Sequence, residues 1–328
     1  MTRNIAQQSI VYTNPEVVFL SKYSEKDAKW DDHKSSTDAV SEMFEAAELV
    51  KPAARTRGCS GVLTFARLTN CATGEVRIRL RQAMFCRVRN CPLCSWRRSL
   101  LWMYRFLQAM PVIQKDYPTS RFLLLTLTVQ NCKIENLRET ISTMNKAWHR
   151  FVKLKEMNSV LGWIRATEVT KEEKRNGYAH PHFHVLLMVK PSFFTHNYVK
   201  RDQWLDAWQK AMRDPLITQV DIRAVKPTEN VGAVAVEVLK YATKAGDLIG
   251  KGANDHQSVY WFKTYVEQVH KMRFIATGGI LKNIFKEGEE TNAELICADV
   301  EKSDDEEIED DFSIYFGWNR EFKKYCKK

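Results

Sequence analysis

The clearest chemical pattern in this chain of 328 residues is the segment HPHFHVLL at 180–187. In a β-strand alternate side chains share a face, so His182 and His184 point to one side of the strand and Phe183 to the other. Two imidazoles on one face of a sheet can bind a divalent metal ion together. His180 is in phase with this pair, but Pro181 bends the entry to the strand, so a role for His180 as a third ligand stays open.

A carboxylate can complete this pair of histidines. Glu168 lies in the segment 162–170, which has the composition of a strand. If that segment pairs with 182–190, Glu168 reaches the same face as the histidines. A set of two histidines and a carboxylate suits Mg²⁺, Mn²⁺ or Zn²⁺. The alternative is a group of surface histidines on an edge strand.

A second pattern is the segment EVLKYATKAGD at 237–247. In a helix over 229–249, Glu237 and Tyr241 stand four residues apart and share a face with Lys244. A tyrosine beside a carboxylate and a lysine can act as a nucleophile with a base and a charge stabiliser. The alternative is an ordinary amphipathic helix with a polar row. Together with the histidine pair, the pattern indicates metal-assisted phosphoryl transfer, in which a phenolate attacks a phosphate polarised by the metal.

A third pattern is a cluster of cysteines. Cys86, Cys91 and Cys94 fall within nine residues, which is typical of a zinc site in a reducing compartment. Cys59 is the first candidate for the fourth ligand and Cys71 is the second. The tight spacing disfavours separate buried cysteines. The zinc is expected to be structural, because no acid or base stands nearby in the sequence.

The charge of the chain is unevenly placed. The net charge is +10, but residues 286–311 hold thirteen acidic residues and two lysines, so the rest of the chain carries +21. A body with this positive charge is expected to bind a polyanion, and nucleic acid is the first candidate. The alternative is a surface whose charge serves only solubility, and charge alone does not separate the two. A small basic patch suited to phosphate contacts surrounds the cysteines and consists of Arg87, Arg89, Arg97 and Arg98.

The composition excludes several classes of protein. Hydrophobic residues make up 44% and charged residues 27% of the chain, which excludes bulk disorder and membrane bundles. The first residues lack the apolar core of a signal peptide. The apolar stretch from Leu100 to Met110 is interrupted by Arg105 and is too short to span a bilayer. The expectation is a cytoplasmic protein without a membrane partner.

The elements that must position these residues follow from periodicity. Strands are expected in a hairpin at 61–85 and at 121–131, 162–170, 182–190 and 217–225. Helices are expected at 96–110, where Pro111 ends the helix, and at 135–157, 198–212 and 229–249, with a further helix and a short strand in 258–285. This order predicts an α+β fold, in which helices pack on a central antiparallel sheet beside a small zinc-binding element.

The same reading predicts five regions. Residues 1–50 form a loosely packed N-terminal extension, 51–115 a cysteine-rich zinc-binding region and 116–285 the catalytic domain. Residues 286–311 form a flexible acidic segment, and 312–328 pack back on the body.

Four segments in this order resemble the replication initiators of small rolling-circle plasmids, the single-tyrosine plasmid Rep family of the HUH endonuclease superfamily. The segments are FCRVRNCPLCSWRRS, FLLLTLTVQN, HPHFHVLL and EVLKYATKAGD. The resemblance runs from about Cys59 onward and leaves the first ~50 residues uncovered. It implies that 116–285 is an HUH endonuclease domain, whose sheet is similar to that of ferredoxin and RRM folds.

The resemblance also implies roles for single residues. Tyr241 matches the nicking nucleophile, Lys244 the lysine of the same motif, and Glu237 the acid that some members of the family use to activate water at termination. His182 and His184 match the pair of metal ligands, and Glu168 falls where a third ligand is expected. The role of His180 stays open between a third ligand, a DNA contact and a loop residue. The implied cofactors are Mn²⁺ or Mg²⁺ at the catalytic site and a structural Zn²⁺.

The activity implied by the resemblance is nicking of one strand at a plasmid origin. The products are a 5′-phosphotyrosine link and a free 3′-OH primer, and the strand is closed later. The implied partners are plasmid origin DNA, a host helicase and a DNA polymerase. The alternatives are a related HUH transposase or relaxase, a non-catalytic zinc-containing DNA-binding regulator, and an RNA-binding protein.

Overall fold

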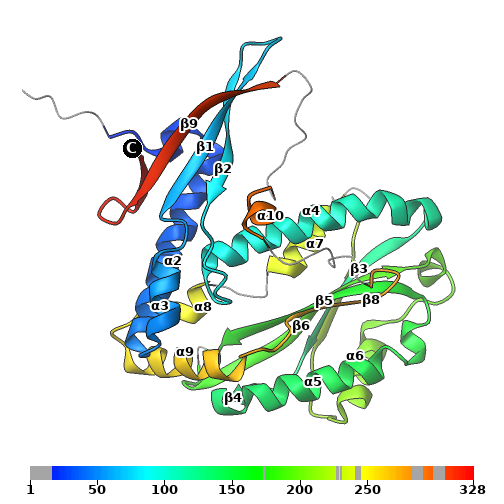
Figure 1. Ribbon diagram of the computed structural model, residues 1–328. Coiled ribbons are helices and arrows are strands. Elements are labelled where there is room, and N and C mark those ends of the chain that lie inside the picture. Colours follow the sequence, from blue (N-terminus) through cyan, green and yellow to red (C-terminus); the bar gives the residue numbers. More distant parts are fainter. Residues whose placement is uncertain are drawn as a thin grey trace, which may run out of the picture.

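The computed structural model describes residues 17–172, 174–226, 229, 231–240, 245–282, 291–297 and 307–328. The structure contains two sheets, each built from antiparallel strand pairs; helices pack on both faces of the larger sheet, and the smaller sheet extends away from them (Figure 1). The predicted α+β class with antiparallel sheets is therefore confirmed. Within the described ranges, no helix combines the length and the apolar character needed to cross a membrane.

The smaller sheet combines strands from distant parts of the sequence. Its strand order is β10-β9-β1-β2, and the strands are β1 (Val62–Asn70), β2 (Val76–Ala83), β9 (Glu307–Asn319) and β10 (Lys324–Lys327). The strands β1 and β2 form the hairpin that alternation predicts, with Ile78 and Leu80 buried. The strand β9 pairs with β1 from Val62 to Asn70, so the end of the chain packs on the body.

The larger sheet contains the histidine strand near its centre. Its order is β7-β3-β6-β5-β8, and the strands are β3 (Arg121–Thr128), β5 (Val160–Lys171), β6 (Tyr178–Val189), β7 (Val220–Ala224) and β8 (Ile275–Gly279), with β4 (Cys132–Lys133) also on β6. The predicted strands all occur, with ends that differ by a few residues. The strand β6 lies between β3 and β5, so the histidines are flanked by a strand on both sides.

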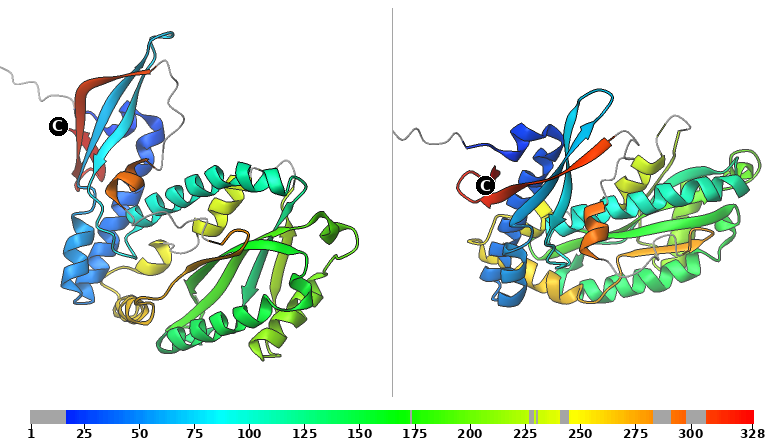
Figure 2. Two further views of the ribbon diagram at one scale, coloured as in Figure 1. Left: turned by 45° about the vertical axis from the view of Figure 1, so that its right-hand side comes forward. Right: turned by 45° about the horizontal axis from the view of Figure 1, so that its top comes forward.

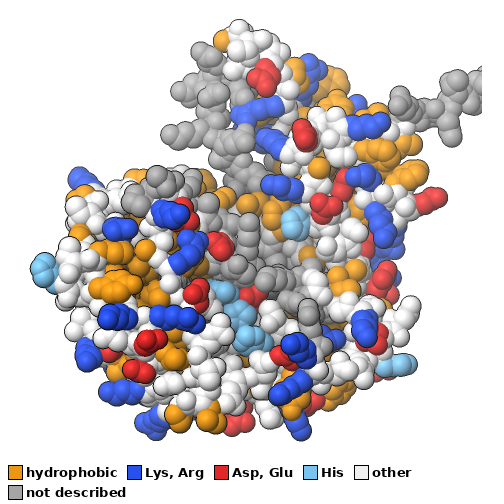
Figure 3. Space-filling view, turned by 180° about the vertical axis from the view of Figure 1, so that it is seen from behind, with side chains coloured by type: hydrophobic (Ala, Val, Ile, Leu, Met, Phe, Trp, Pro, Cys, Tyr) orange, Lys and Arg blue, Asp and Glu red, His pale blue; other side chains and the backbone are white. Residues whose placement is uncertain are grey.

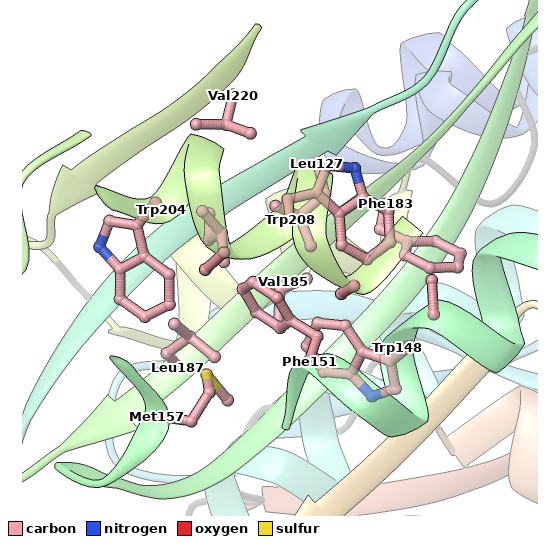
Figure 4. Packing of buried hydrophobic residues seen from close by; sticks show 14 of the residues in the cluster. Leu127, Trp148, Phe151, Met157, Phe183, Val185, Leu187, Trp204, Trp208 and Val220 are labelled. Atoms are coloured by element: carbon pink, nitrogen blue, oxygen red, sulfur yellow. The ribbon is translucent and has the colours of Figure 1, made fainter. Parts of the chain in front are cut away.

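One face of the larger sheet packs on α5 (Leu137–Phe151) and α6 (Arg201–Met212). Alternate residues of β3 and β6, among them Leu127 and Phe183, point to this face. They meet an aromatic layer from the two helices, which is shown in Figure 4 and consists of Trp148, Phe151, Trp204 and Trp208. Each of the two helices therefore buries one face against the sheet, as apolar residues at helical spacing do.

The other face of the larger sheet packs on α4 (Pro92–Asp116) and α7 (Val231–Lys240), as Figures 1 and 2 show. Phe106 of α4 and Val238 of α7 are buried there against Leu186 of β6. The histidines of β6 are in phase with Leu186, because residues two apart in a strand share a face. The histidine face of the sheet is therefore the face that α4 and α7 cover.

The prediction that Pro111 ends the helix is wrong. The helix α4 continues to Asp116 with Pro111 inside it. Proline removes one helical hydrogen bond, at the carbonyl of Leu107. Both Leu107 and Pro111 are on the exposed side of α4, where water can satisfy that carbonyl. A proline on the solvent side of a long packed helix is tolerated for this reason.

The described part of the N-terminal region is packed, and the expectation of a loose arm is wrong for residues 17–50. Trp30, Val40 and Phe44 of α2 are fully buried. Asp31 accepts a hydrogen bond from the backbone of Tyr325 at 2.8 Å, which joins α2 to the end of the chain. The helices of this side of the molecule are α1 (Leu20–Tyr23), α2 (Lys29–Ala46), α3 (Val50–Arg57), α8 (Ala245–Ile249) and α9 (His256–Gln268).

The acidic region also differs from expectation where it is described. Residues 292–297 form α10 (Asn292–Cys297), and Leu295 is fully buried. Residues 307–311 belong to β9. The prediction of a flexible segment is therefore wrong for these two stretches, while 286–290 and 298–306 lie outside the described residues.

Short 3₁₀ turns complete the described structure. They are η1 (Glu25–Ala28), η2 (Ile134–Asn136), η3 (Lys155–Met157) and η4 (Pro191–Phe194). The predicted helix at 135–157 is divided between η2, α5 and η3, and the predicted helix at 229–249 contains α7 and α8. Tyr241 and Lys244 lie outside the described residues.

Candidate metal centre and active site

Glu168 and two histidines converge on the face of the larger sheet. Strand pairing places Glu168 of β5 directly opposite His182 of β6, and His184 lies two residues further along. One carboxylate oxygen of Glu168 lies 2.5 Å from His182 Nε2 and 2.9 Å from His184 Nε2. Glu168 and His182 are buried, while His184 is partly exposed. The hairpin pairing that the sequence predicts is what brings the carboxylate to the imidazoles.

The other ring nitrogens of the two histidines face oxygen atoms. His182 Nδ1 lies 3.2 Å from the backbone carbonyl oxygen of His180, and His184 Nδ1 lies 3.3 Å from Thr126 Oγ1. Thr126 belongs to β3 and stands directly opposite His184 in the sheet. This contact was not predicted, although the alternation of Thr126 and Thr128 in LTLT indicates two hydroxyls on one face.

His180 lies next to this group, and its ring nitrogens are not among the convergent ligand atoms. Its ring centre is 5.1 Å from that of His182. Burial lowers the pKa of His180, and the adjacent His182 lowers it further. The convergent atoms come from Glu168, His182 and His184. His180 contributes its backbone carbonyl to His182, and its role as a third ligand stays a prediction. In the view from behind, histidine side chains gather near the middle of the face (pale blue in Figure 3).

Glu237 stands on the same side of the larger sheet. It is on α7, and its carboxylate lies 3.3 Å from Arg223 Nη2 of β7. Arg223 pairs in register with Leu124, which is in phase with Thr126 and packs in the cluster of α4 and α7. Arg223 also holds Glu229 at 3.0 Å. The helix that precedes Tyr241 in the sequence therefore covers the face that bears the histidines.

The four predicted zinc ligands also converge. The Cys59 sulfur lies 3.5 Å and the Cys86 sulfur 3.6 Å from that of Cys94, and Cys91 completes the group. Hydrogen bonds from the thiols of the other three cysteines lower the pKa of Cys86. Cys71, the second candidate for the fourth ligand, is exposed and lies outside the group.

Both groups have donor sets and separations that suit a cation. The ligand atoms within each group lie within 4.8 Å of one another. Thiolates around tetrahedral zinc at ~2.3 Å stand ~3.8 Å apart, close to the 3.5 and 3.6 Å that separate the Cys94 sulfur from two of its neighbours. The thiol group matches tetrahedral zinc. The Glu168 group matches an ion that accepts imidazole and carboxylate ligands.

Two arginines of the predicted basic patch serve the fold. Arg97 is fully buried and donates to the backbone carbonyls of Leu295 and Ile296 at 2.8 and 3.0 Å. The prediction that Arg97 contacts DNA is therefore wrong, because its guanidinium binds α10. Arg89 is partly buried and donates to the carbonyls of Val269 and Met272 beyond α9.

The other two arginines of the patch remain nearer to solvent. Arg87 is exposed, and it donates to the side-chain oxygen of Asn292 at 3.2 Å. Arg98 is half-buried. Phosphate contacts by these two residues stay a prediction.

The fold and its two convergent groups define an α+β protein with two candidate metal sites. The sequence model of the replication protein family matches residues 77–326. That range includes the larger sheet, the Glu168 group and three of the four clustered cysteines. The chain belongs to the replication protein family.

Curated relatives agree with this assignment over most of the chain. The chain is 33% identical to "Protein rep" of Bacillus amyloliquefaciens, over 92% of this chain and 95% of that protein. It is 30% identical to "Protein rep" of Streptococcus pneumoniae, over 97% and 98% of the two chains. It is 35% identical to a "Replication protein" of Staphylococcus aureus over 65% of this chain and 93% of that protein. No solved structure matches the chain.

Proposed function

We propose that this protein is a rolling-circle plasmid replication initiator that nicks one strand of its origin DNA. The observation that carries the proposal is the convergence of Glu168, His182 and His184 on the sheet face covered by α7. Tyr241 comes directly after that helix in the sequence. Membership of the replication protein family favours this reaction over that of a transposase or relaxase.

The proposed reaction is a transesterification at one phosphodiester. The phenolic oxygen of Tyr241 attacks the phosphorus atom and forms a tyrosine–phosphate ester at the 5′ end. The bond between the phosphorus and the 3′ oxygen breaks, and that oxygen leaves as a 3′-OH after taking a proton. The number of phosphate esters is unchanged, so the step needs no external energy source. The free 3′-OH is the primer that a host polymerase extends, with a host helicase opening the duplex.

Glu168, His182 and His184 are the residues that would hold a divalent ion, Mn²⁺ or Mg²⁺. When bound, such an ion supplies polarisation of a phosphate oxygen and stabilises charge in the transition state. The protein contributes the burial of Glu168 and the pairing of β5 with β6, which fix the three ligands without a loop. Sites on paired strands hold their geometry more closely than sites on loops.

The basic body is proposed to bind the origin duplex. The chain outside 286–311 carries a net charge of +21, which supports salt-dependent binding to phosphates. Arg87 and Arg98 remain candidates for such contacts. The four clustered cysteines are proposed to bind a structural zinc ion that joins the ends of α3, β2 and α4.

Formation of a covalent protein–DNA adduct tests the proposal. The protein is incubated with Mn²⁺ and a library of single-stranded oligonucleotides with randomised positions, and complexes that resist SDS are recovered and sequenced. Wild-type protein is expected to yield an adduct at a defined sequence. Replacing both His182 and His184 by alanine is expected to lower the rate by on the order of 10²-fold or more, because the charge stabilisation is lost.

The matched control for the histidine variant is His196→Ala, which removes an exposed imidazole elsewhere on the molecule. It is expected to keep the wild-type rate. DNA binding measured by fluorescence anisotropy should stay within about threefold in both variants, since phosphate contacts dominate affinity. A wild-type protein that binds DNA but forms no adduct would favour the non-catalytic regulator, and preferential cleavage of RNA would favour the RNA-binding alternative.

Glu237 is proposed to activate water at termination. Glu237→Ala is expected to nick normally but to release itself from DNA ~10²-fold more slowly, the usual contribution of a general base. The measurement uses a DNA substrate with two cleavage sites and determines the fraction of protein that is still covalently attached to DNA after replication has passed the second site.

The control for this prediction is Glu229→Ala, because Glu229 pairs with the same arginine as Glu237. If Arg223 merely needs a carboxylate partner, the two variants will behave alike. Normal termination by Glu237→Ala would make Glu237 a structural residue.

A further inference from the structure

The His184 ring faces Glu168 through Nε2 and Thr126 through Nδ1, and the contact with Thr126 affects how the ring can bind a metal ion. The Nε2 atoms of His182 and His184 both face the same oxygen of Glu168, at 2.5 and 2.9 Å. A cation between these groups takes the lone pair of each Nε2. Each neutral ring then carries its proton on Nδ1, and each Nδ1–H needs an acceptor.

The two rings find different acceptors. His182 Nδ1 faces the backbone carbonyl oxygen of His180 at 3.2 Å. A carbonyl oxygen can only accept a hydrogen bond, so this contact requires the proton on Nδ1. Because the acceptor belongs to the backbone, a side-chain substitution does not remove it. His184 Nδ1 faces the hydroxyl of Thr126 at 3.3 Å, and that acceptor is a side chain. Substitution can therefore remove the acceptor of His184 without changing the backbone.

We propose that Thr126 is a positioning residue of the metal site, whose hydroxyl accepts from His184 Nδ1 and fixes that ring with Nε2 toward the ion. This inference rests on the proposed metal role of Glu168, His182 and His184. Partners of this kind orient a ligating histidine and typically change metal affinity by ~10–100-fold when they are removed. Thr126 stands on β3 directly opposite His184, so the sheet fixes both residues.

The neighbouring threonine offers a matched control. Thr128 lies on the same strand and the same face, opposite His182. Its hydroxyl donates to the backbone carbonyl of Gln219 at 2.6 Å, away from the ring nitrogens. Thr126→Val and Thr128→Val therefore make the same chemical change on one strand, and valine keeps the β-branched shape that strands favour.

The test measures Mn²⁺ affinity of the full-length, zinc-loaded protein by isothermal titration calorimetry. Thr126→Val is expected to weaken Mn²⁺ binding ~10–100-fold, Thr126→Ser to restore most of the affinity, and Thr128→Val to stay within about threefold of wild type. Adduct formation by Thr126→Val should need more Mn²⁺ for half-maximal rate but approach the wild-type rate at saturation. A merely structural role would lower the rate at every Mn²⁺ concentration.

The possible outcomes separate this inference from the proposed function. Wild-type affinity in Thr126→Val, beside loss of binding in His184→Ala, would overturn the role of Thr126 and leave the metal site intact. Equal loss in Thr126→Val and Thr128→Val would also overturn it. A wild-type protein whose Mn²⁺ binding is unchanged by His184→Ala would overturn both the metal site and the positioning role.

Discussion

Tyr241→Phe is expected to abolish the covalent protein–DNA adduct and to lower strand cleavage by roughly 10³-fold or more, as losses of a nucleophile do in other enzymes. The substitution removes one oxygen atom, and that oxygen is the atom proposed to bond to phosphorus. Phenylalanine keeps the aromatic ring, so the substitution tests the hydroxyl alone. The measurement is the SDS-resistant adduct formed with Mn²⁺ and the selected oligonucleotide.

The Tyr241→Phe variant is expected to lose adduct formation but to keep its affinity for DNA. DNA affinity of Tyr241→Phe should stay within about threefold of wild type, since a single hydroxyl adds little beside the phosphate contacts. Tyr260→Phe is the matched control, because Tyr260 is an exposed tyrosine of α9 that donates to Glu135 at 2.7 Å. It should form the adduct at the wild-type rate. An adduct that persists in Tyr241→Phe assigns the nucleophile elsewhere, and peptide mapping of the adduct identifies it.

Cys91→Ser is expected to unfold the region around the four cysteines. Cys91 is fully buried, and its sulfur belongs to a group drawn from the end of α3, the end of β2 and the start of α4. Structural zinc contributes ~10–16 kcal/mol of apparent binding free energy in isolated zinc peptides. Whole domains are stable by only ~5–15 kcal/mol. Loss of one thiolate should therefore abolish zinc retention and lower the melting temperature by at least ~10 °C.

Metal analysis and thermal unfolding check this prediction together. Wild-type protein should contain one zinc ion per chain, and Cys91→Ser should contain much less than one. Cys71→Ser is the control, because Cys71 is an exposed cysteine outside the group. It should match wild type in zinc content and melting temperature. A Cys91→Ser protein with wild-type stability would show that the four thiols hold no structural ion.

Sequence patterns predict those parts of the candidate site that depend on neighbours along the chain. The period of two places His182 and His184 on one face, and the pairing of 162–170 with 182–190 brings Glu168 to them. The tight cysteine spacing likewise predicts three members of the thiol group. These inferences succeed because each depends on local geometry and on one hairpin.

Contacts between distant elements were not predictable in the same way. Arg97 lies four residues after Leu93 and four before Leu101, which places it on the buried side of α4. A buried guanidinium needs acceptors, and these come from α10, almost two hundred residues later. Nothing local to Arg97 indicates that partner, so charge alone gave the wrong role. The Thr126 contact also depends on a pairing between separate strands.

The smaller sheet joins strands from both ends of the chain, so it cannot be completed until the ribosome has made the last residues. The strands of the larger sheet all lie between residues 121 and 279. In the smaller sheet, β1 and β2 are made early, but their sheet is complete only after β9 and β10 at 307–327 have been made. Pairing of β1 with β9 and contact of Asp31 with Tyr325 therefore come last. The larger sheet can form while the chain is still being made, because its strands are complete earlier. A translation product that stops before residue 307 keeps the histidine strand but lacks the strands that complete the sheet next to Cys59 and Cys86.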